Sequence, residues 1–383
     1  MAVKGPLSGV TVVDLTRILA GPYCTMLMVE LGARVIKVEP PGKGDDAREY
    51  GPFVEGRSCY FMSINRGKES IALDLKDPKD RAILDKLLEK ADVVAENFRP
   101  GTMEKLGYGW ETLHKKYPKL IYVAASGFGH TGPASQQPAY DMVVQGLGGI
   151  MSITGNEGQP PSRVGMSIGD IGAGLYTAVA VNAALVHRLK TGESTKVDIA
   201  MFDCQLALLE NAIMRYTVEG EVPGPLGARH PTITPFQAFA TSDGAIIIAA
   251  GNDGLFVKTC EALGRTDMAT DPNYKTNALR QKHHGKLERE IESVLKGNTT
   301  AHWLAVIGKA GIPCGPINNI KQALEHPQVA ARNMLVEAPD GSGGTLKLAG
   351  NPVKMSAFED PKTRRPAPDL DSDRDAILSF LGG

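Results

Sequence analysis

Residues 10–39 read VTVVDLTRILAGPYCTMLMVELGARVIKVE. The apolar, β-branched runs Val10–Leu15 and Arg34–Glu39 predict two buried strands. The residues between them predict a helix, because Gly21-Pro22 places a proline near its start and Leu31-Gly32 places a glycine just past its end. A strand, a helix and a second strand in this order indicate a βαβ unit with a parallel sheet.

The same pattern continues through the first half of the chain. Val93–Glu96 and Leu120–Ala125 predict two further buried strands. A helix is expected from Asp77-Pro78 to about Lys90, because Asp can cap it and Pro can take its first position. A long helix from Asp170 to about Lys190 and another over Met201–Tyr216 follow. We therefore expect an α/β protein with a Rossmann-like half.

The second half of the chain predicts a smaller α/β domain. Strands are expected at Gln237–Ala240 and Ala245–Ala250, separated by the turn Ser242-Asp-Gly. Helices are expected at Leu255–Leu263 and at about 284–295.

Composition narrows the function. The 383 residues include 42 Lys and Arg against 43 Asp and Glu, so no global charge attracts nucleic acid or an anionic membrane. The first residues hold no apolar run long enough for a signal peptide, and no later stretch approaches about 18 uninterrupted apolar residues. The five cysteines are scattered, without a C-x-x-C pair. We expect a cytoplasmic protein that binds neither nucleic acid nor membrane.

Several well-known catalytic motifs are missing. The first strand is followed by Thr16-Arg-Ile-Leu-Ala-Gly-Pro and not by the glycine-rich dinucleotide fingerprint, which makes an NAD enzyme a poor interpretation. A phosphate loop, an H-E-x-x-H motif and a G-x-S-x-G elbow are also missing. His283-His284 have no Cys or carboxylate partner at ligand spacing, so no metal site is predicted.

Six segments resemble the class III CoA-transferases, the CaiB/BaiF family. The resemblance runs from about Leu7 to Phe358 and is strongest to acetyl-CoA:oxalate and succinyl-CoA:dicarboxylate transferases. The segments are LSGVTVVDLTRILAGP from Leu7, LGARVIKVEPPG from Leu31, AENFRPG from Ala95, GFGHTGP from Gly127, GDIGAG from Gly169 and GIPCGP from Gly311.

Asp170 aligns with the nucleophilic aspartate of that family. The alternative is a plain helix N-cap, for which Asp is a preferred residue. The resemblance implies that the Asp170 carboxylate attacks an acyl-CoA and then carries CoA as an aspartyl thioester. The partial positive charge of a helix N-terminus is expected to keep this carboxylate ionised.

Tyr140 and Asp141 fall where the family's transferases have tyrosine followed by an acidic residue. Its other branch, the α-methylacyl-CoA racemases, has histidine followed by aspartate there, and that histidine is one of two bases. Tyr140 is a poor substitute for that histidine. A racemase-like isomerase is therefore the second choice, kept as the alternative function. His130 lies in a glycine-rich loop and could touch the substrate.

The resemblance also implies a set of CoA contacts, in which Arg and Lys suit the phosphates of CoA. Leu19 and Pro40 depart from the formyl-CoA transferases, so acetyl-CoA or succinyl-CoA is the expected donor and a short dicarboxylate such as oxalate the expected acceptor. Arg229, aided by His230, is predicted to bind the acceptor's far carboxylate, and the alternative is that Arg229 pairs with a neighbouring Asp or Glu on the surface. The expected CoA contacts are Arg17, Ile18, Leu19, Ala20, Leu73, Lys76, Asn97, Phe98, Arg99, Lys105 and Leu106.

The family further implies a two-domain chain that forms an interlocked homodimer. Residues 1–200 would form the Rossmann-like part of the large domain, 201–225 a linker helix and crossover, and 226–316 the small domain. Residues 317–383 would return to the large domain. CoA thioesters enter as substrates, and no permanently bound cofactor or metal is expected.

Overall fold

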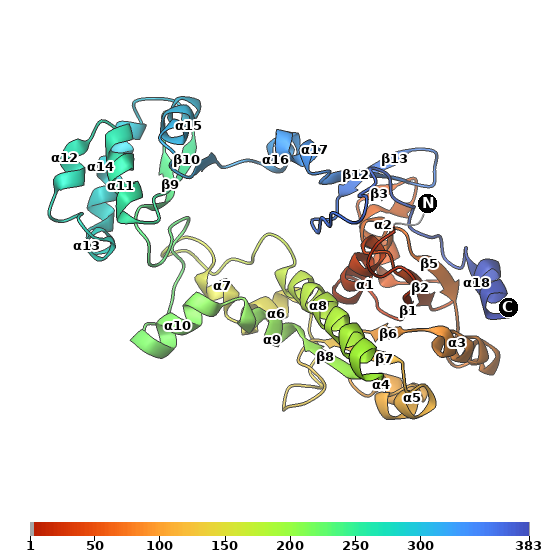
Figure 1. The fold of residues 1–383 in the computed structure, drawn as a ribbon. Coiled ribbons are helices and arrows are strands. Elements are labelled where there is room, and N and C mark those ends of the chain that lie inside the picture. The colour runs from red at the N-terminus through yellow and green to blue at the C-terminus, as the bar shows by residue number, and fades with distance from the viewer. Residues whose placement is uncertain (1–3, 383) are drawn as a thin grey trace. The chain divides into compact units, whose positions relative to one another are not determined.

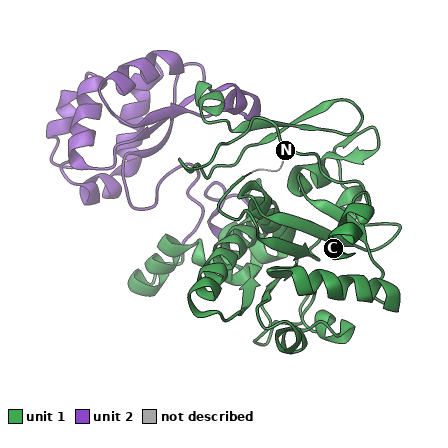
Figure 2. Cartoon of the chain, turned by 45° about the vertical axis from the view of Figure 1, so that its right-hand side comes forward, with its two compact units in different colours: residues 1–151, 163–222, 327–383 green, residues 152–162, 223–326 purple. Residues whose placement is uncertain are grey.

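The computed structural model describes residues 4–382, which divide into two compact units (Figure 2). Unit 1 consists of residues up to 151, 163–222 and those from 327 onward, and unit 2 consists of 152–162 and 223–326. The C-terminal part of the chain therefore belongs to the same unit as the N-terminal part. The predicted small domain, 226–316, falls within unit 2.

A six-stranded parallel sheet forms the centre of unit 1 (Figure 1). The strand order β5-β2-β1-β6-β7-β8 reverses direction between β1 and β6, which is the order of a doubly wound Rossmann-like sheet. All four predicted strands are present, with ends shifted by at most one residue. The strands are β1 (Thr11–Asp14), β2 (Arg34–Glu39), β5 (Glu69–Ala72), β6 (Val93–Glu96), β7 (Ile121–Ser126) and β8 (Lys196–Ala200).

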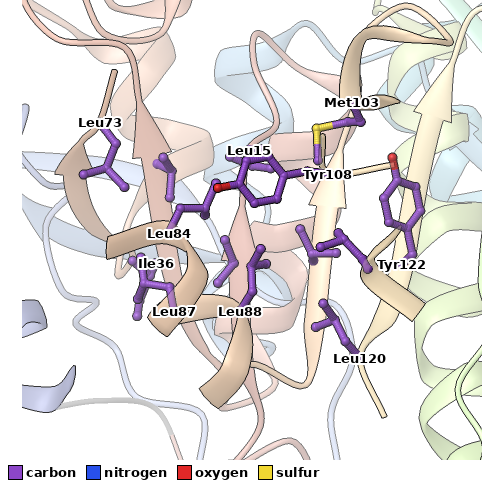
Figure 3. Packing of buried hydrophobic residues seen from close by; sticks show 14 of the residues in the cluster. Leu15, Ile36, Leu73, Leu84, Leu87, Leu88, Met103, Tyr108, Leu120 and Tyr122 are labelled. Carbon is purple, nitrogen blue, oxygen red and sulfur yellow. The ribbon is translucent and has the colours of Figure 1, made fainter. Parts of the chain in front are cut away.

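Helices cover both faces of this sheet, because successive strand residues point to opposite sides. Val13 of β1 packs in one apolar cluster with Leu84 and Leu88 of the helix Pro78–Lys90. Figure 3 shows this cluster between that helix and the strands. Val12 packs in another cluster with Met28 and Val181. A sheet buried on both faces explains the apolar runs within its strands, such as 93–95 in β6 and 121–125 in β7.

The predicted helices of unit 1 are present, with one correction. Asp77 caps the helix that begins at Pro78, by accepting a hydrogen bond from the Lys79 N–H at 2.8 Å. The helix expected over Met201–Tyr216 is instead two helices, separated at Leu208 and Leu209. The predicted helices are α1 (Ala20–Glu30), α3 (Pro78–Lys90), α8 (Ile168–Thr191) and the pair α9 (Met201–Ala207) and α10 (Glu210–Glu219), and unit 1 also contains α18 (Arg374–Gly382).

Shorter elements complete unit 1. Two antiparallel hairpins pair β3 (Phe53–Val54) with β4 (Arg57–Ser58) and β12 (Leu335–Pro339) with β13 (Thr345–Ala349). The short helices are η1 (Asp46–Glu49), α2 (Cys59–Asn65), α4 (Thr102–Leu106), α5 (Trp110–Lys116), α6 (Asp141–Leu147), α7 (Ile150–Ile153), which crosses into unit 2, and α17 (Pro327–Ala331).

The C-terminal part of the chain closes the free edge of the sheet. Asp371 and Asp373 accept hydrogen bonds from the backbone N–H groups of Ala72 and Ser70, at 2.8 and 3.0 Å. Both N–H groups belong to β5, the edge strand, whose donors would otherwise remain unpaired.

Unit 2 is built on a three-stranded antiparallel sheet with helices packed around one apolar cluster. The predicted strands and helices of this region are present, with small shifts at their ends. The elements are β9 (Phe236–Ala240), β10 (Ala245–Ala249), β11 (Cys314–Pro316), α11 (Asp253–Ala262), α12 (Thr266–Thr270), α13 (Asn277–Lys282), α14 (His284–Leu295), α15 (Thr300–Lys309) and α16 (Ile320–Glu325).

Within the described residues, α8 alone is long and apolar enough to span a membrane by length and composition, and half of its most apolar window is buried inside the protein. It packs against α1 and the sheet as a core helix would.

Candidate active site

A cavity of about 400 Å³ lies where the strand order of the large sheet reverses. The loops that follow β1 and β6 form two of its walls, as expected for ligand sites of doubly wound sheets. All residues that line it belong to unit 1. They are 17–20, 97–100, Thr102, 125–127, Ser135, 137–140, Asp170 and Met201.

Asp170 lies in the first turn of α8 and reaches this cavity. Small residues allow the position, because α8 crosses close to α1. A Cβ atom at Gly174 would lie 2.8 Å from the Ala20 carbonyl oxygen, which is too short for any contact with a Cβ. The Gly-Ala-Gly stretch after Asp170 thus lets the start of α8 lie directly against the start of α1.

The pKa of Asp170 is raised, although its position in the first turn of a helix was expected to favour the ionised form. Burial of the side chain, followed by the charge of Asp141, raises the Asp170 pKa to about 7. No residue in the described part of the chain donates a hydrogen bond to this carboxylate. The helix N-terminus was expected to keep Asp170 ionised, whereas burial and the Asp141 charge act in the opposite direction.

Asp141 caps α8 from outside the helix. Its Oδ1 accepts the Gly169 N–H at 2.9 Å, whereas the N-cap residue Ser167 makes no side-chain cap. Its Oδ2 accepts a hydrogen bond from Gln145 Nε2 at 2.8 Å, and the Gln145 Oε1 accepts the Val164 N–H at 2.9 Å. Gln145 is fully buried and ties α6 to the segment that leads into α8.

Sequence reasoning missed Gln145. The only available signal was its spacing of four residues from Asp141, which places both side chains on one face of a helix. Tyr140, in contrast, was a candidate from the sequence. It lines the cavity at the N-cap position of α6, and its side chain is 69% exposed.

His130 lies outside the set of residues that line the cavity. Its Nδ1 is 3.1 Å from Lys196 Nζ, and its Nε2 is 3.8 Å from Glu96 Oε1. Burial and the Lys196 charge lower the pKa of His130, which favours the neutral ring. The neighbours of its ring are therefore side chains of β6 and β8, not residues of the cavity lining.

The expected CoA contacts separate into two groups. Asn97 joins the two loops of the cavity wall, because its side chain binds both the N–H and the C=O of Arg17 at 2.8 Å. The Arg17 guanidinium lies 5.5 Å from the centre of the Phe98 ring. The cavity is lined by Arg17, Ile18, Leu19, Ala20, Asn97, Phe98 and Arg99.

The second group of expected CoA contacts lies outside the lining of the cavity. Leu73 is buried in the apolar core beside α3, and Leu106 packs against the same core. Lys76 and Lys105 are exposed. Leu73 can therefore offer CoA only its backbone, whereas the two lysines remain free to reach a bound phosphate.

Arg229 and His230 belong to unit 2, whereas Asp170 belongs to unit 1. Arg229 is half-buried and lines a second cavity, of about 270 Å³, which Glu157 and Glu288 also line. His230 shapes its own turn, since its Nδ1 accepts backbone N–H groups of the two following loop residues, 232 and 233, at 3.2 and 3.1 Å.

No group of three or more His, Cys, Asp or Glu side chains in residues 4–382 is arranged to hold a metal ion.

Comparison with known proteins identifies the family. The sequence model of CoA-transferase family III matches residues 7–374. The chain belongs to CoA-transferase family III. An acetyl-CoA:oxalate CoA-transferase of Acetobacter aceti is 46% identical over 98% of this chain and 95% of its own length. A succinate–glutarate CoA-transferase of Agrobacterium fabrum is 40% identical over 99% and 96%. The human succinyl-CoA:glutarate CoA-transferase is 38% identical over 94% and 83%.

Solved structures agree with this assignment to CoA-transferase family III. A CaiB/BaiF family protein of Brucella suis is 39% identical, with a TM-score of 0.86 over 99% of this chain and 100% of its own. A Mycobacterium tuberculosis protein is 31% identical, with a TM-score of 0.88 over 98% and 100%. The predicted family is confirmed, and the racemase alternative is not favoured.

Proposed function

We propose that this CoA-transferase moves CoA from an acyl-CoA donor to a small dicarboxylic acid, with Asp170 as the nucleophile. The observation that carries the proposal is the Asp170 carboxylate in the wall of the 400 Å³ cavity at the strand-order reversal. A pKa of about 7 leaves an appreciable ionised fraction at neutral pH, and an ionised carboxylate of raised basicity is the better nucleophile.

The reaction follows from a single carboxylate. An Asp170 oxygen attacks the thioester carbonyl, the C–S bond breaks, and the CoA thiolate leaves behind a mixed anhydride. The thiolate then attacks the Asp170 carbonyl carbon, which releases the donor acid and leaves an aspartyl-CoA thioester. The acceptor carboxylate attacks this thioester to form a second anhydride, and the thiolate cleaves it to acceptor-CoA and free Asp170.

The proposed substrates follow from the relatives. Their names specify acetyl-CoA with oxalate, and succinate or succinyl-CoA with glutarate. Acetyl-CoA or succinyl-CoA is accordingly the proposed donor, and a short dicarboxylate such as oxalate the proposed acceptor. Tyr140 agrees with a transferase, since a racemase needs a base where this phenol lies.

The cavity wall suggests how CoA is held. Arg17 and Arg99 bring guanidinium groups to the same wall as Phe98, which suits the phosphates and the adenine ring of CoA. Lys76 and Lys105 are proposed as further phosphate contacts. Arg229 is proposed to bind the far carboxylate of the acceptor. CoA is a substrate in this scheme, and the proposal requires no resident cofactor.

The proposal extends to assembly and location. We infer a homodimer, because α8 exposes an apolar stripe that includes Leu175, Val179 and Val186, at a spacing that keeps these side chains on one helix face. A cytoplasmic location agrees with CoA thioesters as substrates.

Replacing the nucleophile tests the proposal directly. Asp170→Ala should fold, with an unchanged circular dichroism spectrum, and lose nearly all transfer from acetyl-CoA or succinyl-CoA to oxalate. Mass spectrometry of the wild type after incubation with acyl-CoA should find an adduct on the peptide that holds Asp170. Asp203→Ala is the matched control, because Asp203 lies in the first turn of α9 and outside the cavity lining. Wild-type turnover in Asp170→Ala would contradict the proposal.

A further inference from the structure

Ile18, in the cavity wall, has a backbone conformation that β-branched residues rarely adopt. Its φ is +68°, where the Cβ atom crowds the backbone. Leu19 and Ala20, the next two residues, also line the cavity. Strain of this kind persists only where the surroundings impose it, and it concentrates at functional sites.

A buried ion pair beneath the loop imposes this backbone conformation on Ile18. Asp45 accepts the Ile18 N–H with Oδ1 at 3.0 Å and Oδ2 at 3.3 Å. The Asp45 Oδ2 lies 2.8 Å from Lys37 Nζ, and both side chains are fully buried. Lys37 Nζ also donates to the Thr16 carbonyl at 2.7 Å. The pair therefore holds the chain on both sides of Arg17, through backbone atoms that no strand pairs.

This pair lies within a charge-balanced network. Burial alone would raise the pKa of Asp45, but the charge and hydrogen bond of Lys37, together with the N–H groups of Ala47 and Ile18, outweigh it and hold that pKa below its ordinary value. Three acids and three bases meet here, so their formal charges cancel. The network consists of Asp14, Glu39 and Asp45 with Lys37, Arg48 and Lys68.

A contribution to folding stability does not explain why Lys37 and Asp45 form a buried ion pair at this place. Well-packed apolar residues generally stabilise a core as well as a buried ion pair does, because desolvation of the charges offsets their attraction. Apolar side chains at 37 and 45, however, could not bind the Thr16 carbonyl and the Ile18 N–H. What the pair supplies that apolar residues cannot is therefore the geometry of this loop.

We propose that Lys37 and Asp45 are positioning residues for CoA transfer. They hold Ile18 at positive φ. This conformation places Leu19 and Ala20, at the start of α1, against the group that reacts with Asp170. This inference rests on the proposed transfer at Asp170, and it assigns a role to buried residues that do not touch the cavity.

The test is a double-mutant cycle with the rate of aspartyl-CoA formation as its readout, measured by rapid quench and mass spectrometry. Asp45→Asn keeps the side-chain size and removes the charge that Lys37 binds, so the rate should fall roughly tenfold or more. Glycine adopts positive φ without a Cβ penalty. In the Ile18→Gly background, Asp45→Asn should therefore cost several-fold less than it does in the wild type.

Glu30→Gln is the matched control, because Glu30 is equally buried, pairs with Arg66 and Arg364, and lies outside the cavity. It should lower the Tm and leave the adduct rate unchanged. If Asp45→Asn fails to fold, Lys37→Met/Asp45→Asn replaces it in the cycle, since that variant leaves no buried charge unpaired.

The outcomes separate the two proposals. An unchanged rate in Asp45→Asn, or an equal loss in both Ile18 backgrounds, would overturn the positioning role. A wild-type protein that forms no adduct on Asp170 would instead overturn the proposed function itself.

Discussion

At the scale of single residues, the chemistry depends on two carboxylates with different surroundings. Asp141 has donors for both oxygens, from Gly169 and Gln145, whereas Asp170 has none among the described residues. Asp141 therefore supplies a fixed negative charge and Asp170 the nucleophile. The charge of Asp141 makes Asp170 more basic.

Asp141→Asn tests this division through the pH dependence of transfer. Burial and the Asp141 charge both raise the Asp170 pKa, so removing the charge should move that pKa down from about 7. The nucleophile is the ionised form, and the acid limb of the kcat profile should therefore shift to lower pH. Asp198→Asn, at the His130 loop, should leave the limb in place. An acid limb that stays near pH 7 in Asp141→Asn would rule out the coupling.

Residues differed in how well the sequence predicted them. Tyr140, Asp170 and the loop 17–20 could be placed because their motifs resemble a known family. Lys37 and Asp45 could not be placed, because a lysine in a strand and an aspartate in a loop are usually exposed. Their burial becomes evident only when β2 pairs with β1, which places Lys37 and Asp45 beneath the loop that follows β1.

At the scale of elements, α8 combines three tasks. Its first turn carries Asp170, its small residues pack on α1, and its outer face exposes Val179 at 67%. The sequence predicted its ends to within two residues, since Gly192 marks the stop in the left-handed region. The break between α9 and α10 was not predictable, because Leu208 and Leu209 are good helix formers.

Val179→Glu tests the proposed partner of the exposed face. A charge in the middle of an apolar interface should prevent association, so the variant should sediment as a monomer where the wild type sediments as a dimer. Val257→Glu makes the same change on α11 of unit 2, at another partly exposed valine, and should leave the dimer intact. A dimeric Val179→Glu would show that this stripe is not the interface.

At the scale of the whole molecule, two units share one chain, and Arg229, the proposed acceptor contact, belongs to unit 2. The composition and the alternating pattern predicted two α/β parts. Pattern alone could not show that 152–162 belongs with unit 2, because this stretch joins that unit through tertiary contacts such as Gly227 N–H to the Gly155 carbonyl at 2.8 Å.

Arg229 variants test whether unit 2 selects the acceptor. Arg229→Ala should raise the KM for oxalate or succinate by roughly 10- to 150-fold, the range for a lost charge-assisted hydrogen bond, and leave acetate nearly unaffected. Arg229→Lys keeps the charge without the planar fork and should show a smaller loss. Arg289→Ala, at an exposed arginine of α14, is the control. A uniform effect on both classes of acid would place the selection elsewhere.

The closure of β5 by Asp371 and Asp373 also sets an order of events during synthesis. A ribosome releases the chain from its N-terminus, so all six strands of the large sheet and all of unit 2 emerge before the segment that covers β5. Until translation ends, that edge strand carries unpaired N–H groups, the feature by which sheets aggregate. Nascent chains stalled before residue 371 are therefore the species that most need a chaperone.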